Sequence, residues 1–192
     1  DTGGQFTAAL ASVEASTGAV RAMVGGPGFD NYKYNLVTQG LRQPGSSFKM
    51  IVLMAALENG IVPDDNLDGG SPCSFPNPGG APDPYVASNF GGSRGGRGTI
   101  TSLTTASSNC GYLRLGQIVG LDKVVETARR LGITTPLNPA AMSMPIGAFE
   151  VHPLEMAAMA ATIANGGRYN EPYFIERIED RHGNVIEQHT PE

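Results

Sequence analysis

The sequence has few of the residues that bind metals or cross-link small domains. Its three histidines are scattered and form no motif such as His-Glu-x-x-His, so we expect no metal site and no cofactor. Its two cysteines, Cys73 and Cys110, are too few for a disulfide scaffold and lack metal-type spacing. They are either two unpaired thiols or a single disulfide, which would form in an oxidising compartment.

Long apolar runs and an excess of basic charge are also missing. No run approaches 18 apolar residues, and no basic-then-apolar leader opens the chain, so we expect any anchor or signal to lie outside these residues. The formal net charge is −5, whereas a general nucleic-acid binder has a basic surface. Residues 91–98 resemble an RGG tract, but two arginines in an acidic chain are better explained by a flexible loop. We expect no nucleic-acid partner.

The length and the residues that are present indicate one globular domain, or one and a fraction, with segregated elements. Short apolar runs at residues 6–14 and 19–24 flank a Ser-Thr-Gly turn and predict a β-hairpin, and residues 173–187 predict a second one. Residues 62–98 are rich in proline and glycine and indicate a long loop. Helices are predicted from their periodicity and caps at residues 46–59, 101–106, 112–119, 121–131 and 153–164, and the second of them has Thr99 or Thr101 as its cap. Strands around a helical middle favour an α+β fold over alternating βαβα units.

The stretch that begins at Gln43 places a serine and a lysine at the start of a helix. Pro44 and Gly45 predict a tight turn, and Ser46 and Lys49 then share one helix face. The helix is apolar almost all round, which is typical of a buried helix. A lysine there is paired or has a lowered pKa, and either suits the activator of a nucleophile. Alternatively, Lys49 is a surface lysine and Ser46 a helix cap, but the apolar residues that follow favour the buried interpretation.

A second polar cluster, Ser107-Ser108-Asn109, lies between two predicted helices. Alone, Ser-x-Asn is equally well explained by a helix break whose side chains cap backbone groups. A lone Ser-x-x-Lys is also weak evidence. Together, in this order and both at helix ends, they match the first two signatures of the serine penicillin-recognising enzymes, whose third signature is Lys-Thr-Gly.

The chain resembles the transpeptidase domain of class A penicillin-binding proteins over nearly all of residues 6–188. Further segments similar to that family follow in the family's order at residues 17–26, 42–49, 88–92, 128–133, 154–157 and 164–167. The resemblance implies a β-lactamase-like α+β fold, with an antiparallel sheet packed against helices and a mostly helical subdomain. It also implies a peptidoglycan D,D-transpeptidase at the extracytoplasmic face of the bacterial membrane, whose partners are D-Ala-D-Ala stem peptides and β-lactam antibiotics.

The same resemblance assigns a role to each motif residue. Ser46 would be the acyl-accepting nucleophile and Lys49 its general base. Ser107 would relay a proton towards the leaving amine, and Asn109 would hold the substrate amide or Lys49. The backbone N–H of Ser46 would form one half of an oxyanion hole.

The sequence departs from the family in one respect, because residues 1–192 contain no Lys-Thr-Gly or Lys-Ser-Gly. That element lies beside the nucleophile in the family, binds the substrate carboxylate and supplies the second oxyanion N–H. We therefore expect this chain to be the N-terminal portion of the domain, with an incomplete sheet, and to be inactive without the remainder. The preceding glycosyltransferase domain is absent too. Alternatives are a β-lactamase or D,D-carboxypeptidase of the same superfamily, and a non-catalytic β-lactam-sensing domain.

Overall fold

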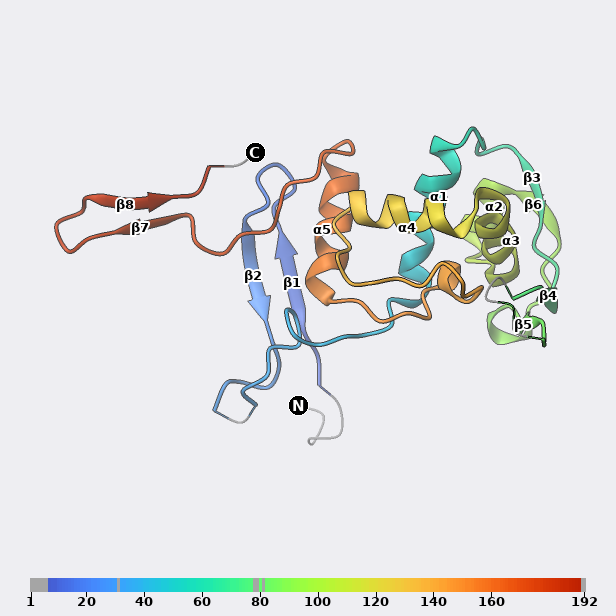
Figure 1. Cartoon of the computed structure of the whole chain (residues 1–192), viewed down its shortest axis with the longest axis horizontal. Coiled ribbons are helices and arrows are strands. Elements are labelled where there is room, and N and C mark those ends of the chain that lie inside the picture. Colours follow the sequence, from blue (N-terminus) through green and yellow to red (C-terminus); the bar gives the residue numbers. More distant parts are fainter. Residues whose placement is uncertain (1–6, 31, 78–79, 81, 191–192) are drawn as a thin grey trace. The chain divides into compact units, whose positions relative to one another are not determined.

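The computed structural model describes residues 7–30, 32–77, 80 and 82–190. The chain divides into two compact units (Figure 1). The first unit comprises Asp1–Arg42, Arg130–Thr135 and Val151–Glu192, and the second comprises Gln43–Arg129 and Pro136–Glu150. Helices and short antiparallel ribbons make up the chain, which confirms the predicted α+β class. Within the described ranges, every sheet has two strands.

The first unit contains both predicted hairpins and one long helix. Strands β1 (Leu10–Val13) and β2 (Val20–Val24) form an antiparallel ribbon, and helix α5 (Pro153–Ala164) packs against β1. Strands β7 (Arg177–Glu179) and β8 (Val185–Gln188) form the second ribbon. The helix has its predicted bounds. Strands β1, β2 and β7 are shorter than the predicted runs, whereas β8 continues one residue beyond the predicted end at Glu187. Residue 6 of the first predicted run lies outside the described residues.

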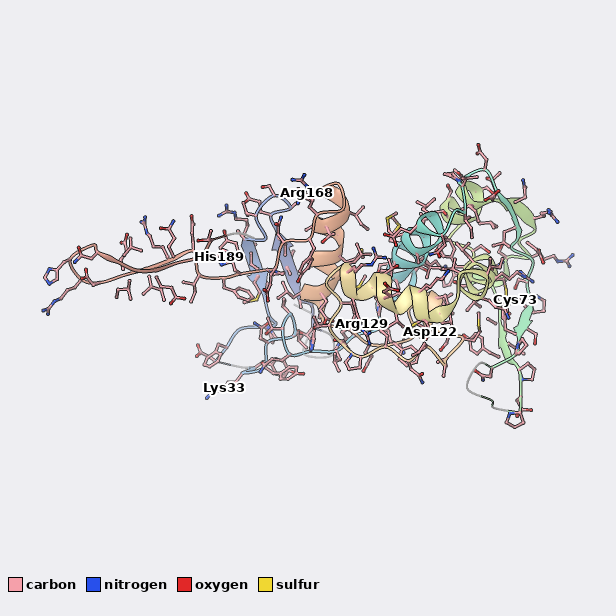
Figure 2. All side chains as sticks on the ribbon, turned by 45° about the horizontal axis from the view of Figure 1, so that its top comes forward. Lys33, Cys73, Asp122, Arg129, Arg168 and His189 are labelled. Atoms are coloured by element: carbon pink, nitrogen blue, oxygen red, sulfur yellow. A yellow bond between two sulfur atoms is a disulfide. The ribbon has the colours of Figure 1, made fainter. Side chains whose placement is uncertain are left out.

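The two ribbons of this unit expose apolar side chains. Every residue of β7 and β8 is exposed, and Figure 2 shows their side chains extending from both faces of the ribbon. The large exposed apolar residues of the four strands are Leu10, Met23, Val24, Ile178, Val185 and Ile186. Exposed apolar strand surface of this kind favours pairing or packing with a further segment.

Glu155 anchors the start of α5. Its buried carboxylate accepts backbone and hydroxyl hydrogen bonds from Thr134 and Thr135, at 2.7–2.8 Å, and the backbone N–H of His152 at 3.0 Å. Burial alone would raise the pKa of Glu155, but the hydrogen bonds from Thr134, His152 and Thr135 outweigh it, so the pKa is lowered. The ionised carboxylate of Glu155 therefore has a structural role at the start of α5.

The second unit is built on helices that meet around α1 (Lys49–Glu58). Helix α1 follows the 3₁₀ turn η1 (Gly45–Phe48) and contacts α3 (Asn109–Val119) and the turn η3 (Met144–Ile146). The remaining helices of the described chain are α2 (Ile100–Thr105) and α4 (Leu121–Arg130).

The predicted helix ends of this unit are confirmed at two caps. Helix α1 ends at Glu58, and Gly60 just beyond it has a φ of +88°, the left-handed conformation that glycine adopts readily. Helix α2 begins after Thr99, whose hydroxyl accepts a hydrogen bond from the backbone N–H of Ser102 at 3.1 Å.

The prediction of a long loop over residues 62–98 was too simple. Strand β3 (Asn66–Asp68) pairs with β6 (Arg97–Thr99), and β4 (Cys73–Phe75) pairs with β5 (Tyr85–Ala87). The short turn η2 (Phe90–Gly92) follows β5 and precedes β6 in the chain. Residues 97–98, expected in a flexible loop, are part of β6. Strands of three residues that pair across long intervals carry no alternating pattern, so the sequence did not indicate them.

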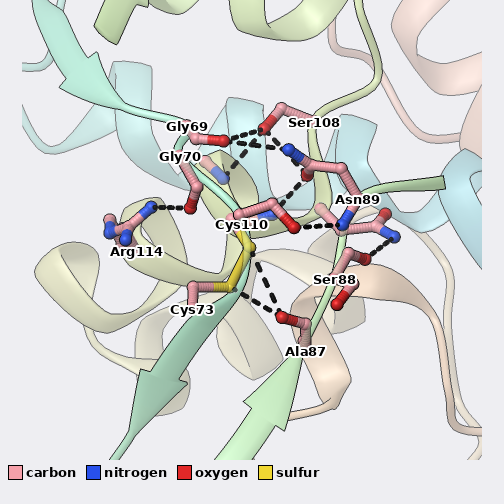
Figure 3. The surroundings of a disulfide bond; sticks show 12 residues. Gly69, Gly70, Cys73, Ala87, Ser88, Asn89, Ser108, Cys110 and Arg114 are labelled. Atoms are coloured by element: carbon pink, nitrogen blue, oxygen red, sulfur yellow. Dashed lines mark hydrogen bonds between the residues drawn. A yellow bond between two sulfur atoms is a disulfide. The ribbon is translucent and has the colours of Figure 1, made fainter. Parts of the chain in front are cut away.

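Cys73 and Cys110 form a disulfide that joins β4 to the first turn of α3, so the interpretation as two unpaired thiols is wrong. Figure 3 shows this bond beside the carbonyl oxygen of Ala87. In the part of the chain that the structure describes, no helix combines the length and the apolar character needed to cross a bilayer.

Candidate active site

The turn that leads into α1 consists of Pro44, Gly45 and Ser46. Gly45 has a φ of +54°, and its N–H donates a hydrogen bond to the carbonyl oxygen of Gly147 at 3.1 Å. Gly147 is itself left-handed at +74°, and a Cβ there would lie only 2.1 Å from the Gly45 carbonyl oxygen. Two glycines in close backbone contact thus place the exposed Ser46 in η1, directly before α1. The predicted tight turn is confirmed, although its first helical turn is 3₁₀.

Lys49 lies at the start of α1 and is only 4% exposed. Its Nζ lies 3.2 Å from Ser46 Oγ, 2.7 Å from the carbonyl oxygen of Ser107, 3.1 Å from Ser107 Oγ and 2.8 Å from Asn109 Oδ1. The ring of Tyr112 lies 5.6 Å away. All four hydrogen-bonding oxygens are uncharged, so the lysine is oriented without a neutralising carboxylate among them.

Burial lowers the pKa of Lys49 from its ordinary value of 10.5 to about 8. The cause is desolvation, because a buried ammonium ion loses the water that stabilises its charge. Near neutral pH, Lys49 is therefore a neutral amine in a larger fraction of molecules than an ordinary lysine would be. With Ser46 Oγ within hydrogen-bond distance, that amine is placed to accept the serine proton.

The second motif lies in the break between α2 and α3. Ser107 has a φ of +50°, and Ser108 caps α3 by accepting a hydrogen bond from the N–H of Gly111 at 3.1 Å. Asn109 begins α3, and its Nδ2 donates to the carbonyl oxygen of Ser88 at 3.0 Å. The hydroxyl of Ser107 and the amide oxygen of Asn109 both reach Lys49.

A cavity of about 670 Å³ opens over this cluster. Ser46, Ser107 and Asn109 contribute to its lining, as do residues 95–98 and the ring of Phe90, which is 93% exposed. Three of the four site residues predicted from the sequence therefore line one cavity, and the fourth, Lys49, contacts all three of them. Sequence reasoning did not identify Ser93 and residues 95–98 as lining, because only folding brings this segment and β6 to the cavity. Within the described ranges, no group of three His, Cys, Asp or Glu side chains could hold a metal ion.

Comparisons with known families and curated proteins agree on one family. The family model of the penicillin-binding protein transpeptidase domain matches residues 8–192. The chain is 36% identical over 183 residues to penicillin-binding protein 1A of Neisseria lactamica and 37% identical over 182 residues to that of Rickettsia felis. Each match covers 95% of this chain and 23% of the relative, so the chain spans about a quarter of the length of these relatives.

Solved structures show the same relationship. Penicillin-binding protein 1A from Haemophilus influenzae matches with a TM-score of 0.88 and 33% identity, covering 97% of this chain and 27% of that one. The PonA1 protein of Mycobacterium tuberculosis, solved in complex with penicillin V, matches with a TM-score of 0.82 and 27% identity, covering 94% of this chain and 49% of that one. The predicted fold type is confirmed by these neighbours.

Proposed function

The chain belongs to the penicillin-binding protein transpeptidase family, and from this membership we propose that it forms part of a peptidoglycan D,D-transpeptidase with a serine acyl-enzyme. The observation that carries the proposal is the contact between Lys49 Nζ and Ser46 Oγ at the mouth of a cavity large enough for a peptide or a β-lactam. The pair supplies a nucleophile and a base that is partly neutral at physiological pH.

In the proposed acylation, neutral Lys49 takes the hydroxyl proton while Ser46 Oγ attacks the carbonyl carbon of the D-Ala-D-Ala bond. The tetrahedral intermediate collapses, the C–N bond breaks, and the terminal D-Ala leaves as an amine. Ser107, in contact with Lys49, relays the proton that this amine needs. An amine of a neighbouring stem peptide then attacks the ester and forms the cross-link. The C–O bond to Ser46 breaks, and the proton lost by the amine passes through Lys49 to Ser46 Oγ, which restores the hydroxyl.

β-Lactams follow the first half of this reaction. Ser46 opens the strained amide, but the leaving nitrogen stays tethered to the acyl group, so deacylation is slow. Asn109 supports both substrates by holding Lys49 through its amide oxygen. Its Nδ2 donates to the carbonyl oxygen of Ser88, which fixes the orientation of the amide.

We propose further that residues 1–192 are the N-terminal portion of the transpeptidase domain. The exposed apolar residues of β1 and β2 support this proposal, since further strands of the sheet would cover them. A strand bearing Lys-Thr-Gly would supply the missing carboxylate-binding and oxyanion groups, and without it we expect the chain to be inactive. A Lys-Thr-Gly or Lys-Ser-Gly in the residues encoded after Glu192 would support this interpretation, and its absence would contradict it.

The proposed location is the extracytoplasmic face of the bacterial membrane, where peptidoglycan is cross-linked. The disulfide between Cys73 and Cys110 supports it, because disulfides persist in oxidising compartments outside the cytosol.

Labelled penicillin tests the proposed function on the complete protein that carries this sequence. We expect a covalent adduct that persists through many minutes after free label is removed, because transpeptidases exclude the water that hydrolyses the ester. A β-lactamase would release the label within seconds. A non-catalytic β-lactam sensor would keep the label but fail to exchange D-Ala in a model peptide. Absence of any adduct together with absence of penicillin hydrolysis would contradict all three interpretations.

The glycine pair behind Ser46 gives a further prediction. In Gly147→Ala the new Cβ would meet the backbone of Gly45, so the turn must move and carry Ser46 with it. We expect acylation to slow by about tenfold to 100-fold, the scale of a displacement near 1 Å. Gly60→Ala is the matched control: it is also left-handed, but a Cβ added there would have no other atom within 4 Å. Equal acylation rates in the two variants would show that the contact with Gly45 does not position Ser46.

A further inference from the structure

Asn89 lies beneath the second motif and contributes to the lining of the cavity, but its side chain bonds to Gly69, Ser108 and Cys110 rather than to Ser46 or Lys49. It follows β5, it is only 8% exposed, and Figure 3 shows its amide between Gly69 and the start of α3. Its Nδ2 donates to the carbonyl oxygen of Gly69 at 2.9 Å. Its Oδ1 accepts from the backbone N–H of Cys110 at 3.1 Å and from Ser108 Oγ at 3.3 Å. One buried amide therefore ties the segment before β4 to α3.

The two residues that Asn89 holds lie on either side of Asn109, and Ser108 directly follows Ser107. Among the residues whose backbone is described, Ser107 is the one non-glycine with a positive φ. A left-handed serine is strained, because its Cβ crowds the backbone, and it persists only where its surroundings enforce it. The hydrogen bonds to Ser108 and Cys110 provide such enforcement, because they fix the backbone immediately after the strained residue.

The position of this backbone also sets the position of Lys49. Three of the four oxygens that contact Lys49 Nζ belong to Ser107 and Asn109. If Ser107 relaxed to an ordinary φ, its carbonyl oxygen and its hydroxyl would both leave the amine. Lys49 would then be free to turn away from Ser46 and to gain water.

The disulfide holds the same turn of α3 independently. Cys110 is tied to β4 through its sulfur and to Asn89 through its N–H. A variant at Asn89 therefore keeps a covalent link between these elements, which makes it possible to separate the geometry of the motif from the stability of the fold.

We propose that Asn89 is a positioning residue, which holds Ser107 and Asn109 in the geometry that keeps Lys49 beside Ser46. This inference rests on the proposed acylation of Ser46. Asn89 acts through the motif and transfers no proton itself.

The test compares Asn89→Ala and the milder Asn89→Asp with Ser88→Ala in the complete protein. Aspartate keeps an acceptor for Cys110 and Ser108 but loses the donor to Gly69. Ser88 is a matched control, since its side chain is exposed and only its carbonyl oxygen contacts Asn109. The measurements are the second-order rate constant of acylation by labelled penicillin as a function of pH, the fraction labelled at saturation and the unfolding temperature.

We expect Asn89→Ala to react about tenfold to 100-fold more slowly. The midpoint of its pH–rate profile should also move above the wild-type value, because a loosened Lys49 regains water and its pKa rises. Asn89→Asp should change in the same direction but less, and Ser88→Ala should match the wild type. A merely structural role would lower the unfolding temperature or the labelled fraction without moving the midpoint.

If the Asn89 variants that fold are acylated at the wild-type rate and with the wild-type midpoint, this inference is overturned and the proposed function is not. A wild-type protein that takes no label would instead overturn the proposed function, and this inference with it. The two failures are distinguished by the wild-type sample.

Discussion

Replacing Ser46 by alanine is expected to abolish covalent labelling of the complete protein by penicillin. The acyl-enzyme is an ester of Ser46 Oγ, and alanine has no atom that could form it. The loss should be at least about 10⁴-fold in acylation rate, the scale seen when a catalytic nucleophile is removed. Mass spectrometry of the intact protein after incubation with excess penicillin measures it directly, as the presence or absence of one adduct.

Ser47→Ala is the matched control for this experiment. Ser47 is also exposed and belongs to the same 3₁₀ turn, but its hydroxyl donates to the carbonyl oxygen of Pro44 at 2.6 Å. We expect Ser47→Ala to be labelled as the wild type is. Persistent labelling of Ser46→Ala would refute the assignment of the nucleophile, and a labelled peptide from that variant would identify the residue that replaces it.

Local signals in the sequence were sufficient for the framework of the site. Spacing alone placed Ser46 and Lys49 on one face, and the apolar run after Lys49 indicated its burial, which the structure confirms at 4% exposure. Caps and breakers predicted that α1 ends near Asn59 and Gly60, and they offered Thr99 or Thr101 as the cap of α2, of which the structure uses Thr99. These features depend on contacts between residues close in sequence, which is why they could be predicted.

The rest of the site depends on contacts between distant segments. No local pattern shows that Ser107 is left-handed, because the strain is maintained by Asn89 and Lys49, which lie far from it in sequence. The β3–β6 ribbon was missed for the same reason: its strands have three residues each and pair across about thirty positions. The sequence also left the state of the cysteines open, since spacing alone does not determine which thiols meet.

The proposed base can be tested by pH and by substitution together. The neutral form of Lys49 increases as pH rises through its pKa, so acylation of the wild type should rise with pH around a midpoint near 8 and level off above it. An ordinary lysine would give a midpoint near 10.5. At pH 7 the lowered pKa makes the neutral amine roughly 300-fold more abundant than it would be in an unperturbed lysine.

Two substitutions distinguish the role of Lys49 as a base from its role as a hydrogen-bond donor. Lys49→Met removes both, and we expect acylation to fall by about 10²- to 10⁴-fold and the rise around pH 8 to disappear. Lys49→Arg keeps donors for Ser107 and Asn109 but cannot lose its proton in this pH range, so it should be as slow as Lys49→Met. Lys123→Met, at an exposed lysine of the same unit, should react as the wild type does. Because the arginine variant preserves the charge and the donors, near-wild-type acylation in a folded Lys49→Arg protein would mean that Lys49 orients Ser46 rather than deprotonating it.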